Sequence, residues 1–473
     1  MVRPDKSIVK RFDSLKAHLK QENPLLLDVM GGYKDLDRVA YRMGLLPTSD
    51  SYAMQIAWWP LVSILGTFSA GKSSFINTYL GGLLQKTGNQ AVDDKFTVIS
   101  FGKDKAGQVL PGIALDADMR FPFYRISTEI EKVVEGEGKR IDAYLQLKVS
   151  DADVLRGKIL IDSPGFDADE QRSSILKITD HIMDISDLVL VFFDARHPEP
   201  GAMQDTLSHL VTNSQSRADS TKFLYILNQI DTAAREDNTE EVVSAWQRAL
   251  SQTGLTTGRY YTIYNAEVAP QIEDEALRER YESKANEDLT EIYSRIDQVE
   301  VERSYRIVGA LENQATSIRD KAVPVLTGLN QRFKSHVLRL DGIVLIALLL
   351  IVLGVGVATK TIGALAALLL SLFADPISMF GAIVVGLIVI GGVHFTVRHL
   401  VRQRMLKGLT ESDESQYTES FKLNTAFYRS IFATEPVGWS ARTEKKIEAV
   451  IERSTTFVQS LNDQFTNPSG ENK

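Results

Sequence analysis

The chain has 473 residues, of which 44% are hydrophobic, and its net charge is −8 at neutral pH. This length and apolar content are enough for a buried core and more than one domain. The mildly acidic charge argues against nucleic acid as the main partner. Because there is no cysteine, a disulfide framework, a thiolate metal site and a cysteine nucleophile are excluded.

The amino-terminal region is charged and helical in pattern. Residues 1 to 22 are rich in lysine, arginine and aspartate and lack the apolar core of a signal peptide. Apolar residues recur near helical spacing from Ile8 to Leu19, and a second apolar set runs from Leu25 to Leu46. We expect residues 1–55 to supply helices to a helical stalk and the soluble part of the chain to stay in the cytosol.

A glycine-rich segment follows the strand-like run Leu61 to Leu65 and has the pattern GxxxxGKS. In this pattern the glycines let the backbone wrap a phosphate chain, helix amides point at it, and the lysine neutralises it. Lys72 is therefore the expected phosphate ligand, and Ser73 would offer its hydroxyl to Mg²⁺. The residues predicted to bind nucleotide in this segment are Gly66, Ser69, Ala70, Gly71, Lys72, Ser73 and Ser74.

A second motif ends the buried-strand pattern of residues 157–161, where the chain reads Asp162-Ser163-Pro164-Gly165. In such a DxxG element a strand-end carboxylate holds the water shell of Mg²⁺, and a glycine amide meets the γ-phosphate. We therefore expect Asp162 to hold Mg²⁺ through water and Gly165 to act as the hinge of a switch.

A third motif follows two more strand patterns, at residues 187–193 and 223–227, and reads Asn228-Gln229-Ile230-Asp231. It is close to NKxD, in which the aspartate accepts two hydrogens of guanine that adenine cannot supply. Asn228, Gln229 and Asp231 are thus the expected base-side residues. Three elements in this order, each at a strand end, predict an α/β P-loop GTPase domain.

These segments together resemble the dynamin superfamily, particularly its EHD branch. The resemblance covers roughly residues 50 to 265 and is carried by residues 68–76, 161–166, 170–172 and 190–195. It implies a dynamin-type GTPase domain at residues 56–268 that leans on a helical stalk. By the same resemblance, Ser69 and Lys72 are the catalytic residues, Ser69 helping to position charge around the transferred phosphate. Membrane remodelling coupled to self-assembly, as a homodimer or higher homo-oligomer through nucleotide domains and stalk, is also implied.

The chain departs from the family pattern at several positions. Phe68 stands where dynamins carry a catalytic glutamine, as a bulky residue does in EHD relatives, so slow hydrolysis is expected. Val92 and Asp93 stand where switch I threonines usually lie, and Thr97 is nearby but out of register. Gln229 replaces the usual lysine, and EHD relatives also bind ATP, so ATP stays open beside GTP.

Residues 269–341 show no strand signal and are predicted to be a helical stalk, as a bundle or coiled coil. Pro324 is expected to interrupt or kink this stretch. The apolar positions that support the helical pattern are Ile307, Leu311, Ile318, Val325 and Leu329.

One long apolar tract covers residues 342–397. Because one membrane span needs about 20 residues, the tract suits two spans, best placed at residues 343–359 and 377–397, with residues 362–374 between them. A three-span arrangement would put the termini on opposite sides. Basic residues flank both ends of the tract, which favours an even number of spans with both flanks cytosolic. These flanking residues are Arg332, Lys334, Arg339, Arg398, Arg402, Arg404 and Lys407.

The sequence thus predicts a P-loop GTPase domain, a helical stalk, a transmembrane helical hairpin and a helical tail at residues 398–473 that returns to the stalk. A hydrophobic insert in a stalk resembles the membrane paddles of bacterial dynamin-like proteins or mitofusins. The expected protein is integral to the bacterial inner membrane with a cytoplasmic nucleotide domain. We expect it to bind GTP and Mg²⁺, hydrolyse GTP slowly, and self-assemble to remodel, tether or fuse bilayers. The alternative is a membrane-tethered, nucleotide-gated scaffold or signalling switch with little turnover, with ATP as a second candidate nucleotide.

Overall fold

The computed structural model forms two compact units, Met54–Ile307 and a second unit that combines Met1–Ala53 with Val308–Lys473. The residues that it describes are 3–22, 24–67, 69–87, 95–102, 106–118, 121, 123, 126–133, 136–165, 172–196, 220–234, 239–252, 258–266, 272–363, 367, 371 and 376–465. The first unit holds the three nucleotide motifs, and the second holds the apolar tract.

The first unit is built on an eight-stranded sheet in the described residues, with strand order β3-β4-β2-β5-β1-β6-β7-β8. Strand β1 lies between β5 and β6 and runs parallel to both, and β6, β7 and β8 continue in the same direction. Strand β2 runs antiparallel to β5. The strands are β1 (Leu61–Gly66), β2 (Phe96–Phe101), β3 (Val109–Pro111), β4 (Leu145–Ser150), β5 (Ile159–Asp162), β6 (Leu188–Asp194), β7 (Phe223–Asn228) and β8 (Arg259–Ile263).

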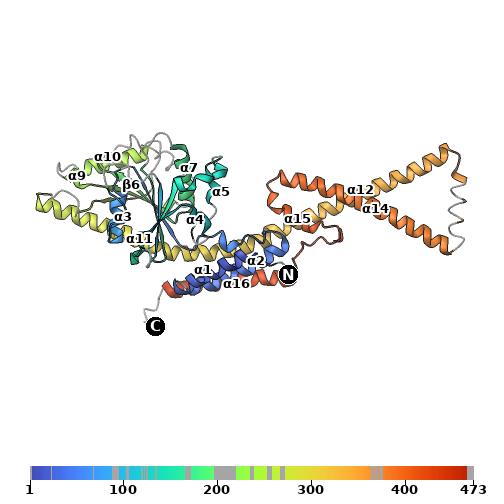
Figure 1. Ribbon diagram of the computed structural model, residues 1–473, viewed down its shortest axis with the longest axis horizontal. Helices are drawn as coiled ribbons and strands as arrows, with labels where there is room; N and C mark the ends of the chain where they lie inside the picture. Colours follow the sequence, from blue (N-terminus) through green and yellow to red (C-terminus); the bar gives the residue numbers. More distant parts are fainter. Residues whose placement is uncertain are drawn as a thin grey trace. The chain divides into compact units, whose positions relative to one another are not determined.

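Helices cover both faces of this sheet (Figure 1). Because alternate strand residues point to opposite faces, Val62 packs with Ile296 of α11 on one face, and Leu61 shares a cluster with Ile182 of α7 on the other. The helices of this unit are α3 (Lys72–Leu80), α4 (Ile113–Ala117), α5 (Ile126–Val133), α6 (Ile141–Tyr144), α7 (Arg172–Ile185), α9 (Asp231–Ala234), α10 (Thr239–Gln252) and α11 (Glu275–Ser317), the last of which continues into the second unit.

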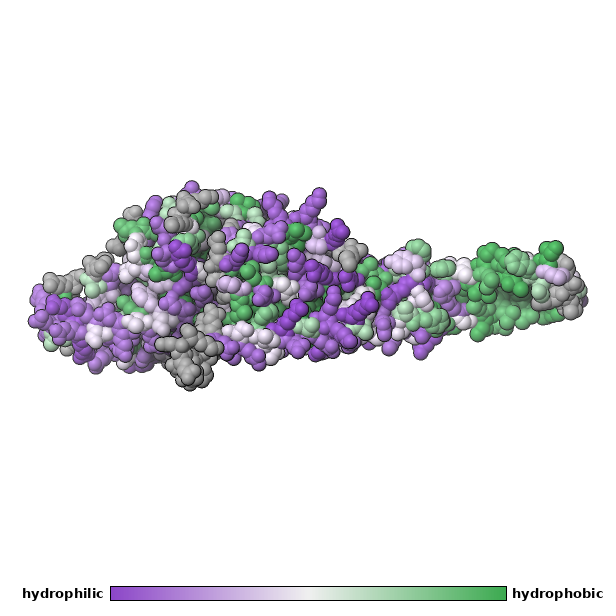
Figure 2. Space-filling view, turned by 90° about the horizontal axis from the view of Figure 1, so that it is seen from below, coloured by the Kyte–Doolittle hydropathy of each residue, from purple (hydrophilic) through white to green (hydrophobic). Residues whose placement is uncertain are grey.

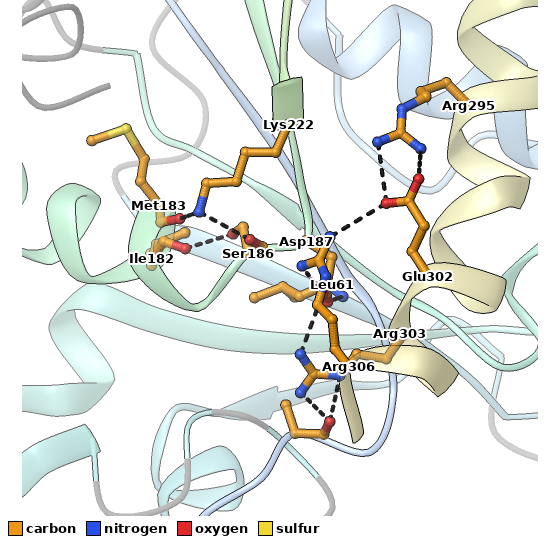
Figure 3. Close-up of polar contacts among 11 residues, drawn as sticks. Leu61, Ile182, Met183, Ser186, Asp187, Lys222, Arg295, Glu302, Arg303 and Arg306 are labelled. Carbon is orange, nitrogen blue, oxygen red and sulfur yellow. Dashed lines mark hydrogen bonds and ion pairs between the residues drawn. The ribbon is translucent and has the colours of Figure 1, made fainter. Parts of the chain in front are cut away.

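The amino-terminal edge of the central strands is fixed by a buried ion-pair cluster around Asp187, just before β6 (Figure 3). Asp187 Oδ1 accepts from Arg306 at 2.7 Å and from Arg303 at 3.1 Å, both on α11. Its other oxygen accepts from the backbone N of Leu61 at 2.9 Å. The carboxylate, 1% exposed, thereby joins the start of β1, the α7–β6 connection and α11.

The second unit is entirely helical in its described residues. Helix α2 packs against both α1 and α16, so the first and last helices share one partner, and α12 packs against α14 (Figure 1). The Ser420 hydroxyl of α15 donates to the carbonyl of Met43 at the end of α2. The helices are α1 (Lys6–Glu22), α2 (Pro24–Met43), α12 (Val323–Ala358), α14 (Pro376–Thr410), α15 (Thr418–Asn424) and α16 (Ala441–Phe465).

Pro324 does not break the helix. A single π-helical turn, Ile318–Ala322, joins α11 to α12, and Pro324 lies in the first turn of α12. The backbone N of Val323 bonds to the carbonyl of Ile318, five residues back, so the helix continues past Pro324 through a change of hydrogen-bond spacing. The expected interruption is therefore a local change of helix type.

The boundary between the units lies within α11 and not before it. Ile292, Ile296 and Val299 of α11 are in the core beneath the sheet, and the division of the chain falls after Ile307. The first part of the predicted stalk thus packs with the nucleotide domain. The division at 1–55, 56–268, 269–341, 342–397 and 398–473 remains a prediction.

Helices α12 and α14 carry the apolar tract. Both are long and apolar enough to cross a membrane, and only 6% and 0% of their most apolar windows are buried. Figure 2 shows the hydrophobic surface concentrated over this hairpin. At the polar end of the tract, His394 Nδ1 lies 2.7 Å from Asp341 Oδ2 and joins the two helices. Most of residues 362–374 lie outside the described part of the chain.

Candidate nucleotide site

The three motifs meet at the carboxyl edge of the sheet. Because β1, β5, β6 and β7 run in the same direction, their last residues lie along one edge. These residues are Gly66, Asp162, Asp194 and Asn228. The carboxyl edge of a parallel sheet is where α/β folds bind ligands.

The lysine of the P-loop is bonded to backbone carbonyls of the same loop. Lys72 is the first residue of α3 and is 7% exposed, and its Nζ donates to the carbonyls of Gly66 and Thr67, each at 2.9 Å. Gly71 has a φ of 84°, and a Cβ there would lie 2.1 Å from Asn228 Nδ2. Glycine is therefore required at this position, and the loop holds a buried cation against backbone oxygens.

The base-side segment is bonded to the P-loop. Asn228 Nδ2 donates to the carbonyl of Ala70 at 2.9 Å, and Gln229 Nε2 donates to that of Ser69. Ser69 and Gln229 both have left-handed backbone conformations, with φ of 60° and 63°. Strained backbone of this kind gathers at functional sites. Asp231 begins α9 and is buried at 7% exposure.

Asp162 is tied to two elements that the motif pattern does not reveal. Its Oδ2 accepts from Gln85 Nε2 at 2.6 Å, and Gln85 Oε1 accepts from Lys148 Nζ of β4. The backbone N of Gln85 donates to Asn77 Oδ1 of α3 at 2.8 Å. The DxxG carboxylate is thus connected to the P-loop helix through one buried amide.

Thr97 lies beside this carboxylate. It is the register partner of Asp162 in the β2–β5 pair and is fully buried. Its hydroxyl accepts from Gln146 Nε2 at 2.7 Å. Phe68, Val92 and Asp93 lie outside the described residues, so the expectations attached to them remain predictions. Gly165 is described, and residues 166–171 after it are not.

A further ion pair at this edge was missed at the level of sequence. Arg196 Nη2 lies 2.6 Å from Asp194 Oδ2 at the end of β6, and the same nitrogen is 3.5 Å from the carbonyl of Ser69. Hydrogen bonding to Asp194 raises the pKa of Arg196 above its ordinary value. A carboxylate at a strand end, followed two residues later by arginine, was the available signal.

The donor types at this edge fit Mg²⁺. Ser73 lies in the first turn of α3, next to Ser74, and Asp162 ends the strand beside β1, so the candidate ligands are oxygens. No cluster of three or more histidine, cysteine, aspartate or glutamate residues occurs in the described ranges. Mg²⁺ usually keeps several waters and takes phosphate oxygens beside one or two protein ligands, which this sparse donor set would allow.

The fold and the loop define a P-loop nucleotide-binding domain. The sequence profile of the dynamin family matches residues 62–230. Residues 62–230 therefore have the fold of a dynamin-type nucleotide domain, and the resemblance to the dynamin superfamily is confirmed. No curated protein matches the chain significantly.

Several solved structures are similar to the chain. Two are described as an oligomerised bacterial dynamin pair that provides a mechanism for long-range sensing and tethering of membranes. One is 14% identical, with a TM-score of 0.33, covering 97% of this chain and 76% of its own. The other is 13% identical, with a TM-score of 0.32, covering 96% and 75%. An Era variant from Aquifex aeolicus bound to GDP and AlF4− is 16% identical, with a TM-score of 0.25, covering 47% and 56%.

Proposed function

We propose that the protein is a membrane-anchored dynamin-like GTPase that binds GTP with Mg²⁺, hydrolyses it slowly, and self-assembles to remodel, tether or fuse bilayers. The observation that carries the proposal is the combination, in one chain, of a P-loop bonded to its base-side segment and two long helices whose most apolar windows are almost entirely unburied. A bilayer would cover that apolar surface.

In this proposal the residues have separate roles. Lys72 exchanges its carbonyl partners for phosphate oxygens, and Ser69 positions charge near the transferred phosphate. Asp231 reads guanine, while Asn228 and Gln229 hold the loop through their amides. The hydroxyl of Ser73 and, through water, the carboxylate of Asp162 hold Mg²⁺, which would neutralise phosphate charge, and the amide of Gly165 meets the γ-phosphate.

In this proposal α12 and α14 are the two spans of an integral membrane protein, and the nucleotide domain lies on the cytosolic side. Basic residues just outside both spans support this orientation. Association of two nucleotide domains, and of the helical units, would couple nucleotide state to the bilayer. Membrane shape would then change only where several copies assemble.

A second candidate is a nucleotide-gated scaffold with little turnover. The observation in its favour is Thr97, the threonine nearest the expected switch I, which is buried and bonded to Gln146. A threonine held in this way is not available to contact the γ-phosphate. GTP could then bind with little hydrolysis.

Phosphate release tests both. Purified protein is assayed with GTP and, separately, with ATP, in detergent and after reconstitution into liposomes, and the Lys72→Ala protein serves as the blank. GTP-selective turnover that the bilayer accelerates supports the GTPase. Tight GTP binding without turnover supports the scaffold, and binding of neither nucleotide contradicts both.

A further inference from the structure

A short loop after α15 exposes three aromatic side chains. We call residues 426–433 the aromatic loop. In it Phe427 and Tyr428 are each 76% exposed, and Phe432 is 65% exposed. The rings of Phe427 and Tyr428 contact each other edge to face, with centroids 5.4 Å apart. Single exposed apolar residues are ordinary, but a cluster of large ones marks an interaction site.

The aromatic loop contacts α12 and α14 near the polar end of the apolar tract, where the tract starts on α12 and ends on α14. Arg398 of α14 donates to the carbonyls of Ala426 and Arg429, the latter at 2.7 Å. Lys334 of α12 lies 5.1 Å from the ring centroid of Phe432. Exposed apolar side chains start on α12 at Leu338, about 6 Å further along the helix at 1.5 Å per residue. The loop therefore lies beside the polar boundary of the hairpin.

The charge around the aromatic loop is positive. Residues 395–410 and 426–433 contain no acidic residue, and Asp341 on α12 is paired with His394. In the described part of the chain, Arg398, Arg402 and Arg429 form no ion pair with a carboxylate, and their Nε atoms have no hydrogen-bond partner. Burial lowers the pKa of Arg429, and the nearby charges of Tyr428 and Glu435 oppose that shift without cancelling it.

From this placement we propose that the aromatic loop is an interfacial membrane-binding element that inserts Phe427, Tyr428 and Phe432 into the headgroup layer of an anionic bilayer. Aromatic residues collect at this depth because the ring is apolar and its edge or hydroxyl is polar. Nearby cations strengthen attachment to an anionic surface. The inference rests on the proposed membrane anchoring and adds a third contact, separate from the two spans.

The absence of cysteine permits a direct test by single labelling. A fluorophore is placed on the full chain at Ser430→Cys in the aromatic loop, at Ile351→Cys in the first span, or at Gln459→Cys on exposed α16. Each protein is reconstituted into two sets of liposomes whose lipids carry bromine, which quenches by contact, either near the headgroup end of the acyl chain or near its middle. The liposomes are pure phosphatidylcholine or contain phosphatidylglycerol as well.

We expect quenching at position 430 by bromine near the headgroup, at position 351 by bromine near the middle of the chain, and at position 459 by neither. At position 430 it is stronger with phosphatidylglycerol and is lost when Phe427, Tyr428 and Phe432 are all changed to serine. Quenching at 351 but not at 430 overturns the membrane role of the loop and leaves the anchor intact. Absence of quenching at both overturns the anchor itself. Energy transfer between position-430 probes on two chains, without lipid quenching, would show that a second copy covers the loop and would also overturn the proposal.

Discussion

The buried charged side chains at the two edges of the central sheet have different kinds of partner. At the carboxyl edge, Lys72 donates to the backbone carbonyls of Gly66 and Thr67, and a phosphate can replace these acceptors. At the other edge, Asp187 is enclosed by Arg303 and Arg306, and no partner can leave without exposing a buried charge. The first edge is suited to exchange partners during a reaction, and the second to hold α11 in place through it.

Lys72→Ala tests the carboxyl edge, where the lysine is expected to exchange its partners for phosphate. We expect a loss of nucleotide affinity of about a thousandfold, or about 4 kcal/mol, because the phosphate charge loses its buried cation. We expect a smaller effect on the unfolding midpoint than on the affinity, since the hydrogen bonds lost with the lysine go to the backbone oxygens of Gly66 and Thr67. Titration with a fluorescent GTP analogue measures the affinity, and Lys86→Ala, an exposed lysine beyond the same helix, is the matched control. Unchanged binding would refute the P-loop assignment.

Asp187→Ala tests the amino-terminal edge, where the ion pairs are expected to stay in place. Removing the carboxylate leaves two arginines facing each other, and we expect the free energy of unfolding to fall by about 3 kcal/mol. Chemical unfolding of the detergent-solubilised protein measures this. Asp153→Ala breaks an exposed pair with Arg156 and should cost at most about 0.5 kcal/mol. GTP affinity of the folded Asp187 variant should stay near wild type, and a large loss would mean that the two edges are coupled.

Asp37 in α2 is a buried carboxylate that lacks the cations of Asp187. Burial raises its pKa to about 6, while Ser51 and the backbone N of Tyr52 donate to it. The folded state therefore holds the proton more tightly than the unfolded state, and stability should fall by about 2 kcal/mol as pH rises from about 4 to about 6.

Asp37→Asn should flatten this part of the pH profile, because the amide carries no charge; its oxygen can accept from the backbone N of Tyr52, and its NH2 can donate to the hydroxyl oxygen of Ser51. The difference between the two proteins in unfolding free energy, measured from pH 4 to pH 8, isolates the contribution of Asp37. Parallel profiles would assign the pH dependence to other carboxylates.

Asp231→Asn should give the smallest effect. Losing the acceptor for the guanine hydrogens should reduce the preference for GTP over ATP by about tenfold, or about 1.4 kcal/mol, with little change in phosphate affinity. Competition binding with the two nucleotides measures the ratio. An unchanged ratio would show that another element reads the base.

The local pattern of apolar residues was sufficient to predict the strands that carry the motifs. The apolar run before the P-loop became β1, and the runs at residues 187–193 and 223–227 became β6 and β7, shifted by a residue or less at each end. The same holds for the two apolar helices, because burial in a sheet and length in a membrane both leave a continuous apolar signal. Pro324 was harder, since a π turn can absorb a proline without ending the helix.

The sequence by itself determined the P-loop fold, the order of the three motifs and the presence of two exposed apolar helices, since each depends on neighbouring residues. Only the tertiary structure decided that Gln85 reaches Asp162 and Lys148 reaches Gln85, and that Arg303 and Arg306 enclose Asp187. The partners in these contacts are 63 to 119 residues apart in the chain. No periodicity records such distant pairs, because they follow from the packing of separate elements around one sheet.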